Sequence, residues 1–188
     1  MEHNRGGSPV LIAHLPAGYL LGRAVARGPR SRWFFAAIVV GSVLPDADML
    51  WWIVGDRSVT HHVFFTHRPF TWLLVALVGA AMSVPSGRCR RWGVAGLGLA
   101  GGALLHCALD SPLSGIQWGH PWSDGLHYGY QIVVPTDESP PLPSGIVLGK
   151  NWMWVWHFVH HWTFAVETFI TGLALGVWLR GRAARAER

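Results

Sequence analysis

Charged side chains are scarce in this 188-residue sequence, and cysteine is nearly absent. Asp, Glu, Lys and Arg make up 13% of the residues, whereas soluble domains usually carry about 25%. Cys89 and Cys107 are too few for a disulfide framework, and helical rise would separate them by about 20 Å. Neither has a partner at zinc-ligand spacing, so both are expected to be packing residues. The composition argues against a soluble domain and against a disulfide-stapled one.

Hydrophobic residues make up 51% of the chain and gather in five blocks. A helix needs about 20 apolar residues to cross a bilayer, and the shorter blocks, of about 16 to 17 residues, require tilting or local thinning. No repeat and no second domain is evident. The sequence therefore predicts an all-α polytopic membrane bundle of about five spans, forming one domain over residues 1–188. The expected spans cover residues 10–26, 33–54, 69–84, 92–109 and 152–179.

The first block also imitates a cleaved signal peptide, because Arg5 precedes an apolar run that ends in Ala24, Val25 and Ala26. His14 and Arg23 interrupt that run, which favours a retained first span.

Basic residues orient the expected bundle. Eleven of the fifteen fall in loops on one side, and positively charged loops stay in the cytoplasm. The N-terminus is therefore predicted outside and the C-terminus in the cytoplasm of a multi-pass inner (plasma) membrane protein. The same topology explains the net charge of +5, so no nucleic-acid partner is expected. The eleven residues are Arg23, Arg27, Arg30, Arg32, Arg88, Arg90, Arg91, Arg180, Arg182, Arg185 and Arg188.

A long stretch rich in Pro and Gly, residues 111–151, separates the fourth and fifth spans on the outer side. It exceeds an ordinary connection in length and is predicted to be a functional loop or lid. Trp118 and Trp122 within it are expected near the membrane interface.

Histidine and aspartate residues cluster at the outer ends of the expected spans. Ionisable side chains in membrane segments are costly and mark binding or transport sites. The clustering predicts a metal site at the membrane surface. The residues are His14, Asp46, Asp48, His61, His62, His67, His106, Asp110, His157, His160 and His161.

Spacing supports two of these clusters as ligand sources. His106 and Asp110 are four residues apart and share one helix face, although a hydrogen-bonded His–Asp pair has the same spacing. Asp46 and Asp48 follow Pro45, which breaks or kinks the second span, and each is a candidate ligand or general base. Mixed His and Asp ligands suit Zn, Mn or Fe better than Ca.

The segment before the third span adds His67 and, next to it, Arg68. A histidine ligand beside a fixed positive charge suits a phosphate ester substrate. His61 and His62 are candidate accessory ligands or orienting groups. His14 alone would more commonly be a packing residue.

Together the motifs GSVLPDAD, HHVFFTHR, HCALD and GIQWGHPW, with His14 and Gly18 before them, resemble the YdjM-like family of inner-membrane metal-dependent hydrolases over about residues 10–125. The resemblance implies metal binding and hydrolysis by the motif positions. Met49, Val63 and Arg68 depart from the family pattern. A more distant similarity to zinc-dependent phospholipase C and related nucleases implies phosphodiester hydrolysis with more than one zinc ion. This chain lacks the HxxxE pair of those enzymes. The motif positions are Asp46, Asp48, His62, Thr66, His67, His106 and Asp110.

The fifth span carries a polar stripe at helical spacing. It has three interpretations: an accessory metal or substrate pocket, a haem site, or polar packing. Its members are His157, His160, His161, Phe164 and Glu167.

These observations predict a membrane-embedded hydrolase that acts on a lipid or lipid-linked ester or phosphoester through a metal-activated water. The expected ligands are His67, His106, Asp110 and one of Asp46 and Asp48, with His14 on a second ion. The remaining aspartate would act as general base and Arg68 as a clamp for negative charge. A metal or proton transporter, or a non-catalytic regulator that retains a metal site, is the alternative. The transporter hypothesis predicts more ionisable residues toward the cytoplasmic half of the bundle, and apart from Glu167 the sequence has almost none there.

Overall fold

Helices make up nearly all of the regular structure in the computed structural model, which describes residues 12–26, 32–50, 61–112, 115–127, 159–160 and 162–186. Among these residues no strand forms, and Ile116 and His127 make an isolated bridge. The predicted all-α class is therefore confirmed. The elements are α1 (His14–Val25), α2 (Arg32–Gly41), the 3-10 turns η2 (Pro45–Ala47), η3 (His61–Val63) and η4 (Phe65–His67), then α4 (Pro69–Ser83), α5 (Arg88–Asp110) and α7 (Trp162–Ala186).

Two of these helices are long and apolar enough to cross a membrane: α5, and α7 over residues 162–184. The other apolar helices are shorter, with 10 residues in α2 and 15 in α4. Within the span expected over 33–54 the helix is interrupted, because α2 ends at Gly41 and the chain turns into η2. Pro45, which has no N–H to donate, begins that turn, so the predicted break is confirmed.

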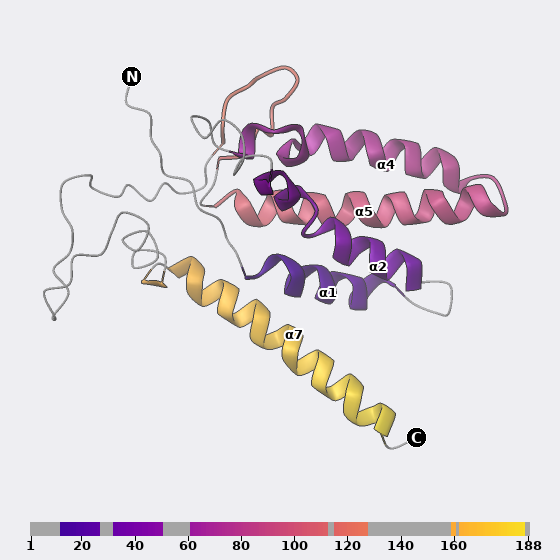
Figure 1. Cartoon of the computed structure of the whole chain (residues 1–188), viewed down its shortest axis with the longest axis vertical. Helices are drawn as coiled ribbons and strands as arrows, with labels where there is room; N and C mark the ends of the chain where they lie inside the picture. Colours follow the sequence, from indigo (N-terminus) through magenta and orange to yellow (C-terminus); the bar gives the residue numbers. More distant parts are fainter. Residues whose placement is uncertain are drawn as a thin grey trace, which may run out of the picture.

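Helix α5 is the centre of the bundle (Figure 1). It packs against α4 on one side and α2 on the other, and α2 in turn packs against α1. Gly87, with φ of +80°, ends the tight turn that brings the chain from α4 back into α5. Helix α7 meets α1 near its own start and then runs away from the bundle (Figure 1).

Glycines let α2 approach α5 at backbone distance. A Cβ added at Gly41 would lie 2.1 Å from the Leu99 carbonyl oxygen, and one added at Gly102 would lie 2.1 Å from the Ile38 carbonyl oxygen. Small residues at helix interfaces are typical of membrane bundles, where close van der Waals packing drives association. The α2–α5 contact therefore sets how far the C-terminal end of α2 lies from α5.

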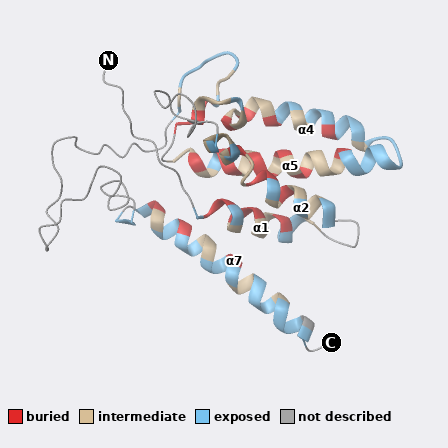
Figure 2. Cartoon of the chain, in the orientation of Figure 1, coloured by how far each residue is buried: buried red, intermediate tan, exposed pale blue. Residues whose placement is uncertain are grey.

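The buried residues of the bundle gather where its helices face one another (Figure 2), and many large apolar side chains are exposed. Leu77 on α4 and Phe169 on α7 are among many exposed apolar residues. The buried core contains Trp72, Ala100, Ala103, Cys107 and Ile116. This distribution suits helices that face lipid.

Replacing Gly102 by Leu is expected to destabilise the protein by about 1–3 kcal/mol or more, since the added side chain has no room against α2. The measurement is thermal unfolding in detergent, followed by tryptophan fluorescence. Gly101→Leu is the matched control, because no atom lies within 4 Å of a Cβ at that position. Equal melting temperatures for the two variants would contradict the close contact.

Candidate metal centre

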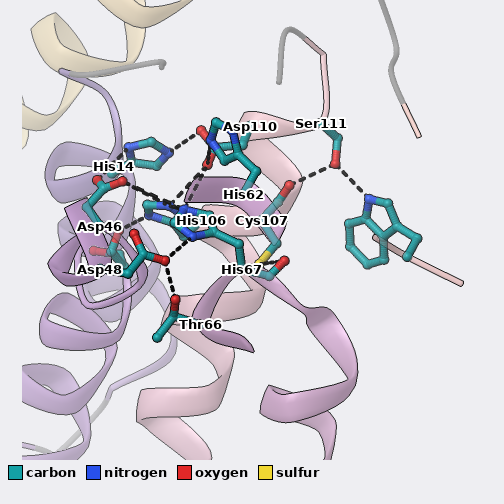
Figure 3. A network of polar contacts seen from close by, with 12 residues as sticks. His14, Asp46, Asp48, His62, Thr66, His67, His106, Cys107, Asp110 and Ser111 are labelled. Atoms are coloured by element: carbon teal, nitrogen blue, oxygen red, sulfur yellow. Dashed lines mark hydrogen bonds and ion pairs between the residues drawn. The ribbon is translucent and has the colours of Figure 1, made fainter. Parts of the chain in front are cut away.

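Six His and Asp side chains from five elements converge at one end of the bundle (Figure 3). Four are histidines and two are aspartates, and the ends of α1 and α5 face the three 3-10 turns across them. We call this set the central cluster: His14 from α1, Asp46 from η2, His62 from η3, His67 from η4, and His106 and Asp110 from α5.

His106 is held by a backbone carbonyl. Its Nδ1 lies 2.9 Å from the carbonyl oxygen of Ser42, and because a carbonyl only accepts, Nδ1 carries the proton. The break before Pro45 explains this acceptor: the α-helix ends at Gly41, so the Ser42 carbonyl is free to turn toward α5. Nε2 of a neutral His106 therefore presents a lone pair to the cluster.

His67 is held in the same way by a carboxylate. Its Nδ1 lies 2.8 Å from Oδ2 of Asp48, which also accepts a short hydrogen bond from the Thr66 hydroxyl. Trp72 fixes this turn further, because its indole N–H donates to the Thr66 carbonyl oxygen at 2.7 Å. A carboxylate on Nδ1 directs the Nε2 lone pair inward, an arrangement common for metal-binding histidines.

The two inward nitrogens face each other. Nε2 of His67 and Nε2 of His106 are 3.2 Å apart, and in the neutral rings both are acceptors. Two lone pairs at this distance repel unless a proton or a cation lies between them or beside them. The pair is therefore suited to hold a positive charge.

Carboxylate oxygens surround this pair. Asp110 places Oδ2 at 3.1 Å from Nε2 of His106 and at 3.7 Å from Nε2 of both His62 and His67. Its other oxygen, Oδ1, lies 3.1 Å from Nε2 of His14. Asp46 spans the cluster similarly, with Oδ1 at 3.5 Å from Nε2 of His106 and Oδ2 at 3.8 Å from Nδ1 of His14.

Several atoms of the cluster are buried without a hydrogen bond. Apart from the His–Asp contacts just described, both ring nitrogens of His14, Oδ1 of Asp46 and both oxygens of Asp110 lack a hydrogen-bond partner within the described ranges. Burying such groups is costly unless something satisfies them. The side chains of the cluster also form three overlapping groups of potential metal ligands. In each group, one ligand atom from each residue lies within 4.8 Å of the others: His14–His106–Asp110, Asp46–His67–His106 and His62–His67–Asp110. Imidazole and carboxylate donors fit Zn, Mn or Fe.

Asp48, predicted as a ligand or base, does not belong to any of these three groups. Its Oδ2 is taken by His67 and Thr66, whereas its buried Oδ1 has no hydrogen-bond partner in the described part of the chain. The geometry therefore points to an orienting role, and Asp46 is the aspartate that faces the cluster.

Arg68, the predicted clamp, points to the loop of residues 115–127. Its Nε donates to Oε1 of Gln117 at 2.9 Å, and Nη1 lies 3.4 Å from Nε2 of His120. Asp124 completes this contact with Oδ1 at 3.2 Å from Nδ1 of His120. The guanidinium thus pins the loop beside the His67 turn.

The accessory residues separate into three cases. Glu167 is buried, but its Oε2 accepts the Ile12 N–H at 3.2 Å and the residue is in none of the three ligand groups. His160 is exposed and outside those groups. His157 and His161 lie outside the described residues, and of His61 only the backbone is described.

Sequence reasoning missed Ser42, Gln117 and His120. Pro45 signalled the free carbonyl that Ser42 supplies, because a broken helix leaves acceptors unpaired. Gln117 and His120 lie in the motif GIQWGHPW, but the motif did not predict their contacts with Arg68, which depend on how a Pro-rich loop folds back.

Asp48→Ala is expected to weaken divalent metal binding about 10- to 100-fold, the usual cost of losing a partner that orients a histidine ligand. Asp48→Asn should bind within a few-fold of the unchanged protein, because the amide oxygen still accepts from Nδ1 of His67. Competition titration with a chromophoric chelator measures both, with the exposed Asp124→Asn as control. If Asp48 is itself a ligand, both substitutions will weaken binding strongly.

Comparison with known proteins assigns the chain to a family. No curated protein and no solved structure gives a significant match. The model of one family, described as YdjM inner membrane protein, matches residues 10–186 and so covers the central cluster, α5 and α7. The chain therefore belongs to the YdjM inner membrane protein family.

Proposed function

We propose that this protein is a metal-dependent hydrolase that acts on a lipid or lipid-linked ester or phosphoester at the membrane. The observation that carries the proposal is the pair of inward Nε2 atoms, 3.2 Å apart and ringed by two buried or half-buried carboxylates. Such a set of acceptors at the outer ends of apolar helices supports cation binding, and divalent cations with His and Asp ligands commonly serve hydrolysis.

The number of donors favours two ions. Zinc usually takes four ligands, including a water at catalytic sites, whereas the central cluster offers six protein residues. Asp110 has one oxygen toward His14 and the other toward His62, His67 and His106, which suits a carboxylate shared by two ions. We assign His14 to the second ion, with zinc as the expected metal.

Asp46 lies at the edge of the cluster from which water or substrate would reach the centre. Its side chain is 29% exposed, whereas those of His14, His67, His106 and Asp110 are at most 2% exposed. An accessible carboxylate at the edge of a buried cluster can accept the proton of an attacking water or bind an ion directly. A bound divalent ion would supply Lewis acidity and lower the pKa of its water toward neutrality.

The remaining residues orient the histidine ligands and recognise the substrate. Asp48 and the Ser42 carbonyl hold the rings of His67 and His106, so their Nε2 atoms need not rotate when the substrate binds. Arg68 is assigned to the negative charge of a phosphoester, with Gln117 fixing the direction of its guanidinium.

The membrane arrangement that we propose has five apolar segments, with the central cluster outside and the C-terminus in the cytoplasm. The helix ends that carry Arg23, Arg32 and Arg88 lie at the end of the bundle opposite the cluster (Figure 1). A centre at the outer lipid headgroups would meet lipid substrates by lateral diffusion.

Purified protein in detergent is expected to contain close to two zinc ions per chain and to hydrolyse phospholipid or a lipid-linked ester. His106→Ala should lose most of the metal and at least about 100-fold of the activity, because it removes a ligand from the centre. Elemental analysis and product detection by mass spectrometry provide the readouts. His127→Ala, an exposed histidine outside the cluster, is the control.

Two outcomes would redirect the proposal. Metal-free unchanged protein would refute the metal centre. Bound metal without turnover on any lipid would favour a transporter or a regulator.

The proposed orientation predicts that Cys89, which is exposed in the basic first turn of α5, reacts with a membrane-impermeant maleimide only after the membrane is permeabilised. Cys107 is buried and should stay unlabelled. Ser123→Cys in a Cys89→Ser background places a thiol on the loop of residues 115–127 and should react in intact cells or spheroplasts. The opposite labelling pattern would invert the topology.

A further inference from the structure

We infer that Glu167 of α7 is a positioning residue for the central cluster: it accepts the backbone N–H of Ile12, the residue before the N-cap of α1, and so fixes His14, the first residue of that helix. The inference rests on the proposed metal centre. No residue of α7 is in the three ligand groups, and the inference gives this helix a role at the centre.

The start of α1 has no cap of its own. Helix N-termini leave backbone N–H groups unpaired, and Ser, Thr, Asp or Asn usually accepts one of them. Residues 10–13 read Val-Leu-Ile-Ala, and Ala13 at the N-cap makes no side-chain hydrogen bond. In a membrane protein an unpaired N–H is especially costly, so an acceptor from elsewhere is required.

Glu167 supplies that acceptor from 155 positions away. Its Oε2 lies 3.2 Å from the Ile12 nitrogen, and the side chain is buried with 2% exposure. A carboxylate at a helix N-terminus is also favoured by the helix dipole. The contact joins α7 to α1 at the point where the two helices lie closest in Figure 1.

His14 depends on its backbone for its position more than the other histidines do. His106 and His67 each have Nδ1 held by an oxygen, from Ser42 and Asp48 respectively. Nδ1 of His14 has no such oxygen within hydrogen-bond distance among the described residues, its nearest carboxylate oxygen being Oδ2 of Asp46 at 3.8 Å. The His14 ring is held by Oδ1 of Asp110 at 3.1 Å from Nε2 and by stacking on the His106 ring, with centroids 3.9 Å apart. Moving the start of α1 would therefore move the His14 ring directly.

The second carboxylate oxygen argues for positioning over metal binding. Oε1 of Glu167 has no hydrogen-bond partner within the described residues, and Glu167 lines a mostly apolar pocket together with Ala13, Leu109 and Val166. Ala13 and Leu109 are the chain neighbours of His14 and Asp110. Glu167 thus lies near the cluster, and it is in none of the three ligand groups.

The test compares Glu167→Leu with Glu167→Gln in purified full-length protein, with Thr168→Val as control. Gln keeps an oxygen for the Ile12 N–H, whereas Leu removes it. Thr168 is the exposed neighbour, and its hydroxyl bonds only within α7, to the Phe164 carbonyl oxygen. The readouts are Co²⁺ titration, followed by the visible ligand-field absorption, and the metal count.

Glu167→Leu is expected to weaken the His14-dependent ion about 10- to 100-fold and to give the same change in the Co²⁺ spectrum as His14→Ala. Glu167→Gln and Thr168→Val should retain the unchanged spectrum and stoichiometry. Since Glu167→Gln must bind metal normally, it keeps the inference testable even if the Leu variant fails to fold.

Unchanged Co²⁺ binding in Glu167→Leu would overturn the inference and leave the metal centre intact. Equal losses in the Gln and Leu variants would also overturn it, because the carboxylate would then act by charge or as a ligand. Failure of the unchanged protein to bind Co²⁺ or Zn²⁺ would overturn the proposed function together with this inference.

Discussion

Two imidazole lone pairs aimed at one another are the constraint on which this structure depends. Nε2 of His67 and Nε2 of His106 cannot turn away, because Asp48 and the Ser42 carbonyl hold the opposite nitrogens. The repulsion between them must be offset by positive charge, and the carboxylates of Asp46 and Asp110 add to that demand. The end of the bundle is built to concentrate negative potential at a point that water barely reaches.

The bundle brings its segments to that point by two means. Glycines let α2 and α5 approach until backbone atoms meet, which places the Ser42 carbonyl against His106. The break before Pro45 then turns the chain, so that Asp46 faces the cluster and Asp48 faces the His67 turn. Packing that appears purely structural therefore sets the separation between ligand atoms.

The sequence predicted the parts of this arrangement that depend on local rules. Helical spacing placed His106 and Asp110 together, Pro45 marked the end of α2, and low charge with apolar blocks indicated membrane helices. Roles that depend on distant contacts were not accessible. Asp46 and Asp48 look alike in sequence, and their division of roles comes from the positions of η4 and α5. Glu167 followed a histidine stripe that suggested ligation, yet its partner is the backbone N–H of Ile12, just before the first helix.

The bond from Ile12 to Glu167 has a consequence for biosynthesis. Chains leave the ribosome from the N-terminus, so α1 is made before the residue that accepts the Ile12 N–H, 155 positions later. Until α7 is made, the Ile12 N–H lacks this acceptor and the start of α1 is held by one contact fewer. Synthesis of the last helix thus completes the contact that positions the first. A chain stalled or cut before α7 would contain every residue of the central cluster but would lack that contact.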